Sequence, residues 1–404
     1  YIKKAHSILK AKQFLKTKTN MMKKKEEEMN QYLRKLLRQD VIDKQLFYRL
    51  RSTCSSIAVM YGQPKAHKIN YPLRPIISNV GSYNYELSKY LTKVIEQHRP
   101  EKSFSFVKDT FDFVKRLRAV KKINEKVLVS FDVDSLFTNV PVDETIELIL
   151  KLIYKSGKPG DVPFERDQFK QLLEMAVKNT PFRFLNDFYI QQDGVSMGSP
   201  LGPIFADVFM SKVEQNLNRF STNKPLLFLR YVDDIFCILK KKHNIPDFLQ
   251  RMNKWHKNIK FTVEYEDNNK IPFLDTMIIR DVQNDKFQTT IYRKPTHTDL
   301  YLLYDSNQSR KYKLGLIRSL VIRILLICSS PSYSKTEIDR LKVILKNNGY
   351  PEHIIKRGVR EGEIITKNII NKQQQSQNLP PSSQLNKKKI LFFTIPYYGN
   401  ESTV

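Results

Sequence analysis

Three aspartates stand at the ends of apolar segments, where they could bind divalent cations together. Asp233 and Asp234 separate the apolar runs 226–229 and 235–239, and Asp132 ends a third apolar run. Adjacent carboxylates repel each other, so they stay ionised together mainly when a divalent cation neutralises them. Two cations held about 4 Å apart can activate an attacking hydroxyl and stabilise a leaving oxygen, which is the chemistry of nucleotidyl transfer. A solvated Asp-Asp turn is the simpler explanation of the pair taken alone, so the rest of the chain must decide.

A β-hairpin and a strand would position these carboxylates. The apolar, β-branched and aromatic residues on both sides of 231–234 predict paired strands with the two aspartates at the tip. The segment 127–132 predicts a buried strand that carries Asp132 at its C-terminal end. After Pro141, apolar residues at helical spacing predict a helix with Asp143 as its N-cap. This order of strand, carboxylate and helix is common in α/β and α+β enzymes, which carry functional groups at strand ends.

Glycines gather before the hairpin. Gly194, Gly198 and Gly202 fall within nine residues and make up a quarter of the chain's twelve glycines. Such a cluster indicates that the backbone approaches another group closely. The segment 193–207 leads into a helix with an apolar face, and its backbone N–H groups could contact a ligand. No Gly-Lys-Ser or Gly-Lys-Thr sequence follows, so the segment is not a P-loop and does not by itself establish nucleotide binding.

A cationic stretch precedes both aspartate segments. Two prolines within 71–78 exclude a helix there and favour an extended chain. Lys65, Lys68 and Arg74 would then project from strands and turns. A fixed cationic pocket suits a triphosphate, and arginine adds bidentate geometry to it. A generic basic surface explains the same charges equally well.

The composition favours a polyanionic partner. The 404 residues allow two or three packed subdomains, and the formal charge of +28 comes from 69 Lys and Arg residues. Nucleic acid phosphates are the commonest such partner, with binding that weakens as salt rises, and an acidic membrane surface is the alternative. The longest apolar stretch, 314–328, is too short to span a bilayer and contains two arginines, so we predict no transmembrane segment and no secretory signal. The three isolated cysteines predict neither a disulfide framework nor a zinc site, which fits a reducing intracellular compartment.

The order of these motifs resembles the reverse transcriptases, most closely those of Penelope-like retroelements, which are related to the telomerase-type enzymes. The sequences YGQPKAHK and LRPIIS look like the family's finger motifs, FDVDSLFTNVP like its motif A, GVSMGSPLGPIFAD like its motif B and YVDD like its motif C. NIKFTVEYEDNNKIPFLDTMI followed by YRKPTHTDLY looks like the late palm and primer-grip region of the Penelope-like group. The resemblance runs in order from about Ala58 to Asp305, so it is more specific than any single motif.

The resemblance implies an α+β chain with the right-hand polymerase fold. Residues 57–125 would form the fingers and 126–280 the palm with its antiparallel sheet. Residues 281–404 would form the primer grip and a mainly helical thumb, with a low-complexity segment at 371–389. Residues 1–56, rich in Lys and helical in pattern, would form a basic helical N-terminal extension.

The resemblance also implies roles for individual residues. Asp132 and Asp233 would be catalytic metal ligands, with the backbone carbonyl of Val133 as a further ligand and Asp234 as a weaker or indirect one. Phe137 matches the aromatic steric gate that crowds a ribose 2′-hydroxyl, and simple core packing is the alternative for this ring. The remaining contacts would come from Lys65, Lys68 and Arg74 to the triphosphate, Gly198 and Ser199 to the nascent base pair, and Lys257 or Lys260 as the acid that protonates pyrophosphate.

The implied activity is RNA-directed DNA polymerisation. A reverse transcriptase of this group extends a primer 3′-hydroxyl with deoxynucleoside triphosphates on an RNA template, using two Mg²⁺ ions for which Mn²⁺ can substitute. Its partners would be the RNA template, the DNA primer and the RNA–DNA hybrid, contacted mostly through phosphates, with no membrane involved. We expect an intracellular, nuclear location, and the sequence leaves the oligomeric state open. A telomerase-like polymerase and a catalytically inactive nucleic-acid-binding remnant of a retroelement are the alternatives.

Two features depart from the wider family pattern. Many reverse transcriptases have Gln in the glycine loop where this chain has Met197, and Met is usual at this position in the Penelope-like group. Members of that group usually carry a C-terminal GIY-YIG nuclease, and the sequence contains no Gly-Ile-Tyr string. We therefore expect either a chain cut short near Tyr398 or an endonuclease-lacking branch, and we assign no DNA cleavage to these residues.

Overall fold

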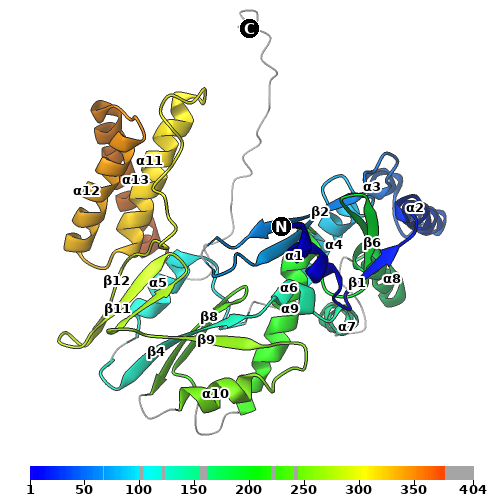
Figure 1. Cartoon of the computed structure of the whole chain (residues 1–404), viewed down its shortest axis with the longest axis horizontal. Coiled ribbons are helices and arrows are strands. Elements are labelled where there is room, and N and C mark those ends of the chain that lie inside the picture. The colour runs from blue at the N-terminus through cyan, green and yellow to red at the C-terminus, as the bar shows by residue number, and fades with distance from the viewer. Residues whose placement is uncertain are drawn as a thin grey trace, which may run out of the picture. The chain divides into compact units, whose positions relative to one another are not determined.

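The protein is described by a computed structural model that covers residues 1–66, 68–99, 103–120, 123–154, 162–219, 224–240 and 244–377. The chain divides into two compact units, whose helices and strands are labelled in Figure 1. The first unit comprises Tyr1–Thr298 and Ile327–Tyr333, and the second comprises Asp299–Leu326 and Ser334–Val404. None of the helices in the described ranges is both long and apolar enough to cross a membrane.

The first unit contains a four-stranded antiparallel sheet that carries the predicted hairpin. Its strands, in spatial order, are β7 (Leu227–Tyr231), β8 (Asp234–Lys240), β4 (Lys126–Val133) and β9 (Phe261–Tyr265). Tyr231 of β7 pairs with Asp234 of β8 across a turn formed by Val232 and Asp233. The predicted hairpin and the predicted strand ending near Asp132 are both confirmed.

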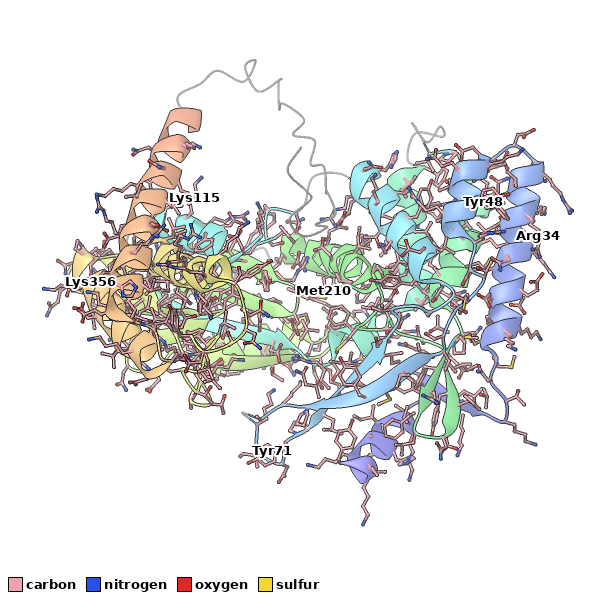
Figure 2. The ribbon with its side chains drawn as sticks, turned by 90° about the horizontal axis from the view of Figure 1, so that it is seen from above. Arg34, Tyr48, Tyr71, Lys115, Met210 and Lys356 are labelled. Carbon is pink, nitrogen blue, oxygen red and sulfur yellow. The ribbon has the colours of Figure 1, made fainter. Side chains whose placement is uncertain are left out.

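Helices cover one face of the four-stranded sheet. Val129, Phe131 and Val133 of β4 belong to a buried cluster that these helices complete. Its helices include α9 (Leu201–Val213) and α10 (Ile245–Met252), together with α4 (Tyr85–His98), α7 (Val142–Ile153) and α8 (Arg166–Val177), which pack on α9 or on one another. Met210 of α9 lies fully buried in this layer (Figure 2), and burial of each such side chain stabilises the fold by about 1.5–3 kcal/mol.

The other face of the four-stranded sheet packs against α5 (Thr110–Arg118) and a three-stranded sheet. That sheet consists, in order, of β10 (Lys270–Phe273), β11 (Thr276–Asp281) and β12 (Lys286–Ile291). Leu128 of β4 and Phe236 of β8 belong to this second buried cluster. Because alternate side chains of a strand share a face, Asp132 lies on this face, as does Asp234 directly opposite it.

The cationic stretch forms part of a five-stranded sheet. Its strands, in order, are β1 (Phe14–Thr17), β6 (Asp187–Gln191), β5 (Thr180–Phe184), β2 (Ala58–Pro64) and β3 (Leu73–Ser78). β2 and β3 form the extended hairpin that the prolines predict, and Figure 2 shows Tyr71 near its tip. Lys65, Lys68 and Arg74 therefore belong to a hairpin and its connecting loop.

The strand β1 corrects the expectation that residues 1–56 form a purely helical extension. Three segments there are helical: α1 (Ile2–Leu9), α2 (Met22–Arg38) and α3 (Lys44–Leu50). Between the first two, β1 adds an edge strand beside β6. Phe14 of β1 is buried and meets Phe182 of β5 edge to face, so packing on the sheet overrides the helical pattern.

Helix α7 begins earlier than predicted. Pro141 occupies the N-cap position, and no side chain caps the helix there. Asp143 lies in the first turn and forms an ion pair with Lys178, so its prediction as N-cap is wrong. Its carboxylate still favours the helix, because it lies near the positive end of the helix dipole.

The second unit is helical in its described residues. Its helices are α11 (Arg310–Ile327), most of α12 (Pro331–Asn347), and α13 (Glu352–Gln377). A Cβ at Gly358 would lie 2.6 Å from Cγ2 of Ile317, and one at Gly362 would lie 2.8 Å from Cβ of Val321. These two glycines of α13 therefore allow it to pack closely on α11.

The C-terminal boundaries differ from those expected from the sequence. A boundary at 281 would separate β11 from β12, which pair along their whole lengths, whereas the second compact unit begins at Asp299. The low-complexity segment 371–389 continues α13 as far as Gln377. Its remaining residues lie outside the described part of the chain.

Candidate active site

The hairpin tip is fixed against the end of β4. Asp132 pairs directly with Asp234, and the backbone N–H of Val133 donates a hydrogen bond to the backbone carbonyl of Asp233 at 3.1 Å. Val232, the first residue of the turn, has a φ of +56°. Residues directly opposite on antiparallel strands have Cβ atoms about 4.5–5.5 Å apart. The fold therefore brings all three predicted aspartates to one end of the sheet.

The three carboxylates repel one another. Partial burial, followed by the charge of Asp233, raises the pKa of Asp132, whereas Lys68 and Lys65 lower it. Burial, followed by the charges of Asp233 and Asp132, raises the pKa of Asp234 to about 6. A bound divalent cation would remove this repulsion by neutralising the ionised forms.

The donor set fits a cation that takes its other ligands from substrate and water. Within the described ranges, no three His, Cys, Asp or Glu side chains stand close enough together to hold a metal ion. Asp132, Val133 and Asp233 nevertheless line one cavity. Mg²⁺ is usually bound by one or two carboxylates together with substrate phosphates and waters, without a cage made only of protein. The residues present therefore match the chemistry of such an ion.

The main cavity unites residues of the two larger sheets in a volume of about 680 Å³. Arg74 of β3 lies opposite Gln63 of β2, and both line it. Seven predicted site residues are brought together in its wall: Lys65, Lys68, Arg74, Asp132, Val133, Phe137 and Asp233. Cations and carboxylates thus face one space, as the binding of a triphosphate with its metal would require.

The glycine loop reaches this cavity through Met197. Gly198 and Ser199 are not among the described residues that line it. A Cβ at Gly198 would stand 2.0 Å from the carbonyl oxygen of Ile77 in β3. Ser199 is buried and accepts a hydrogen bond from the N–H of Leu201 at 3.3 Å. The close approach expected of the glycines is therefore to the neighbouring strand, and contact of Gly198 and Ser199 with a base pair stays a prediction.

A second cavity of about 440 Å³ shares Asp132 and Lys68 with the first. Asp234 and Lys294 line it, and the charge of Lys294 lowers the pKa of Asp234 against the effect of the aspartates. Asp233 lines the main cavity and Asp234 the second one, so the two adjacent carboxylates face different spaces.

The lysines suggested as the general acid stand elsewhere. Lys257 and Lys260 are absent from the described residues that line the two cavities. The backbone carbonyl of Lys260 accepts a hydrogen bond from the N–H of Asp134 at 2.9 Å. Their suggested role therefore gains no support from the geometry.

The N-terminal residues also line the main cavity, which the sequence did not indicate. They are Ser7, Ile8, Ala11, Gln13 and Phe14. Nε2 of Gln13 donates a hydrogen bond to Oδ1 of Asn139 at 3.4 Å, and Asn139 ends α6 (Leu136–Asn139), the helix that carries Phe137. The alternation of Lys and Thr after Phe14 is a local signal that could have identified β1.

Two family models match parts of the chain. Residues 64–274, more than half of the 404, match the model described as reverse transcriptase (RNA-dependent DNA polymerase). Residues 300–360 match the model described as an animal helix-turn-helix domain. No curated protein sequence matches the chain.

Solved polymerase structures resemble the fold. Telomerase from Candida albicans, in complex with a TWJ fragment of telomeric RNA, is 12% identical over 78% of this chain and 56% of its own, with a TM-score of 0.51. Apo telomerase from Candida tropicalis, truncated from its C-terminal domain, is 15% identical over 57% of this chain and 54% of its own (TM-score 0.43). The Sicinivirus 3Dpol RNA-dependent RNA polymerase is 12% identical over 83% and 70%, respectively (TM-score 0.48).

This chain thus covers only 54% and 56% of the lengths of the two telomerases. The Candida albicans match and the family match together confirm the expected right-hand polymerase fold for this mixed α+β chain.

Proposed function

The chain belongs to the reverse transcriptase family, and on that premise we propose that it extends a primer 3′-hydroxyl with deoxynucleoside triphosphates on an RNA template. The observation that carries this proposal is a single cavity lined by Asp132 and Asp233 and by Lys65, Lys68 and Arg74. Nucleotidyl transfer requires carboxylates for metal and positive charge for the triphosphate. The net charge of +28 supports a phosphate-rich RNA–DNA hybrid as the partner.

In the proposed mechanism, the chain mainly positions charge. Asp132, Asp233 and the carbonyl of Val133 would hold the divalent metal, which we propose is Mg²⁺; two such ions would supply activation of the attacking hydroxyl and stabilisation of the leaving oxygen. Arg74, exposed on β3, can donate two parallel N–H bonds to phosphate oxygens, and Lys65 adds a compact positive charge.

Primer extension on poly(rA)–oligo(dT) tests this proposal. The purified chain is expected to incorporate dTTP with Mg²⁺ or Mn²⁺ and to lose affinity for the hybrid as salt rises. Binding of the hybrid without incorporation under either metal would overturn the enzymatic proposal and leave the nucleic-acid-binding remnant.

We further propose that the enzyme belongs to a Penelope-like retroelement. Met197 in the cavity wall and the sequence YRKPTHTDLY after β12 support this narrower assignment. A telomerase-like polymerase is the alternative, and the similarity of the fold to that of Candida albicans telomerase is consistent with it. If the enzyme extends primers on unrelated RNA templates, the result favours the retroelement enzyme. If it requires one specific RNA as its template, the result favours the telomerase-like polymerase.

Phe137 is expected to discriminate against ribonucleotides. It lines the main cavity, and its carbonyl accepts a hydrogen bond from the N–H of Val195 at 2.8 Å, which fixes its backbone. A Cβ at Gly202 would lie 3.6 Å from the ring, so the first turn of α9 packs directly against it. Phe137→Val is expected to raise ribonucleotide incorporation relative to deoxyribonucleotide about 10- to 100-fold, equivalent to about 1–3 kcal/mol.

The ratio of kcat/KM for UTP and dTTP measures this selectivity. Phe137→Tyr keeps the ring and should keep the discrimination, so it serves as the control. Unchanged sugar selectivity in Phe137→Val would assign the ring to core packing instead.

Asp234→Asn is expected to stabilise the metal-free protein at pH 7. The pKa of Asp234 is raised from 3.8 to about 6, so between these values the native state binds more protons than the unfolded state. The free energy of unfolding therefore falls as pH rises through this window, and the ionised carboxylate destabilises the native state above it. Each pKa unit corresponds to about 1.4 kcal/mol and the side chain is partly solvated, so we expect a gain of about 1–2 kcal/mol at pH 7.

Urea denaturation in EDTA at pH 5 and pH 7 measures this difference. The advantage of Asp234→Asn over the wild type should be smaller at pH 5, where the native carboxyl is mostly protonated. An equal advantage at both pH values would contradict the raised pKa.

A further inference from the structure

Arg230 of β7 is the largest side chain that the described residues bury completely, with 1% of it exposed. Its Nε donates a hydrogen bond to Glu214, which begins the 3₁₀ helix η1 (Glu214–Arg219). One Nη donates to Oδ1 of Asp207 in α9 at 3.0 Å. The other Nη donates to the backbone carbonyl of Val232 in the hairpin turn at 3.2 Å. The guanidinium therefore joins two acidic residues to the turn that carries Asp233.

Further hydrogen bonds hold this buried group in place. Glu214, itself 6% exposed, accepts from Oγ of Ser105 at 2.7 Å. Asp207 accepts from Arg99 at 2.5 Å, so two guanidinium groups balance two carboxylates. The backbone N–H of Arg230 donates to the carbonyl of Ser105 at 2.6 Å. The guanidinium and the backbone of Arg230 are thus both anchored.

Core stability alone does not explain this arrangement, because well-packed apolar side chains often replace buried ion pairs without loss of stability. What an apolar side chain cannot supply is the bond to the Val232 carbonyl. Val232 is β-branched and has a φ of +56°, a conformation that L residues with branched side chains disfavour. The turn therefore requires an interaction from outside itself to stay in this conformation.

We propose that Arg230 is the positioning residue of the metal-binding turn, an inference that rests on the proposed function. Arg230 holds the carbonyl of Val232, and the N–H of Val133 holds the carbonyl of Asp233 at 3.1 Å. With the peptide groups on both sides of Asp233 fixed, its carboxylate is held in the cavity that Asp132 also lines. Through Asp207, the same guanidinium ties the turn to α9, the helix that follows the glycine loop.

Arg230→Lys tests the proposal. A lysine keeps the positive charge beside Glu214 and Asp207, but its single ammonium group lacks the planar fork that reaches the two carboxylates and the Val232 carbonyl together. We expect kcat to fall about 10- to 100-fold and the Mg²⁺ concentration at half-maximal activity to rise about tenfold. The KM for dTTP and the Kd for the hybrid should stay within about threefold of the wild-type values, because other residues make those contacts.

Arg280→Lys is the matched control. Arg280 is also largely buried, and it pairs with Glu266 at 2.6 Å and donates to the carbonyl of Lys126 at 2.9 Å, away from the turn. The Arg280→Lys substitution should leave kcat and the Mg²⁺ requirement unchanged. An equal rise in the Mg²⁺ requirement in both variants would show that the effect comes from a general loosening of the fold, and it would overturn the proposal.

A second variant keeps the test decisive if Arg230→Lys fails to fold. Combining Arg230→Met with Glu214→Gln removes one buried charge of each sign and leaves Asp207 paired with Arg99, so neither of these two ions is left unpaired. A folded double variant with a wild-type Mg²⁺ requirement would overturn the proposal. A folded double variant with a raised requirement would support it.

Two readouts do not depend on polymerase activity. Mn²⁺ affinity, measured by electron paramagnetic resonance without nucleotide, should weaken about tenfold in Arg230→Lys. Hydrogen exchange of the 227–240 peptide should accelerate in this variant, and wild-type values for both measurements would overturn the proposal. A wild type that binds Mn²⁺ but extends no primer would refute the proposed function, while these readouts would still decide the role of Arg230.

Discussion

Asp233→Asn is expected to abolish primer extension and leave the hybrid bound. Asn has nearly the same volume as Asp, and the hydrogen bond from the N–H of Val133 goes to the backbone carbonyl of residue 233, so the turn should keep its shape. The substitution removes one of the two carboxylates that would hold the metal in the main cavity. Loss of a metal ligand at the reacting centre should reduce kcat roughly a thousandfold or more.

Primer extension on poly(rA)–oligo(dT), with hybrid binding measured by fluorescence anisotropy, checks this expectation. The Kd for the hybrid should change by less than about threefold, because binding comes mostly from phosphate contacts to basic residues. Asp267→Asn is the control, since Asp267 is exposed and is not among the described residues lining either cavity. Retention of a tenth or more of the wild-type rate by Asp233→Asn would contradict the assignment of Asp233 as a metal ligand.

The sequence was sufficient for the central hairpin because its signals are local. The apolar runs on both sides of 231–234 become β7 and β8, and both faces of the sheet are covered, which explains why the runs are nearly continuous. The strand that ends near Asp132 was recognisable for the same reason. Its pairing with β8 could only be suspected from the shared carboxylate chemistry, and the register of Asp132 against Asp234 required the structure.

Partners that lie far apart in the sequence were not predictable. The alternation after Phe14 could indicate a strand, but β1 pairs with β6 across more than 160 residues of sequence, and nothing in residues 14–17 specifies that partner. Arg230 did leave a signal, since a charged residue inside an otherwise apolar strand must find buried partners. Its partners Asp207 and Glu214 lie on other elements, so their identity could not be inferred from spacing.

For the glycine loop, the sequence correctly indicated a close approach of the backbone but not the group that it approaches. The cluster indicated close backbone approach, and Gly194 has a φ of +74° with a Cβ that would lie 2.6 Å from the carbonyl oxygen of Thr138. Gly198 approaches Ile77 in the same way. The sequence suggested a ligand as the approached group, whereas these two glycines approach the protein's own backbone.

Gly198→Ala is therefore expected to destabilise the first unit strongly. The new methyl group would stand 2.0 Å from the carbonyl oxygen of Ile77 and 3.1 Å from the Cα of Ser78, and backbone atoms cannot rotate away. The loop must withdraw from β3, which weakens the bonds from Oγ of Ser196 to the Ile77 carbonyl at 2.9 Å and to Asn79 at 3.1 Å. Overpacking together with lost buried hydrogen bonds should cost about 2–4 kcal/mol.

Urea denaturation followed by fluorescence of Trp255, the only tryptophan, reports on this unit because the indole packs near Phe228 and Phe261. Gly315→Ala is the control of opposite sign. A Cβ at Gly315 in α11 would meet no atom within 4 Å, so alanine should stabilise that helix by about 0.5–1 kcal/mol, seen by circular dichroism. If the Trp255 transition of Gly198→Ala matched that of the wild type, the loop would not be in close contact with β3. This result would refute the explanation that residue 198 must be glycine because of that contact.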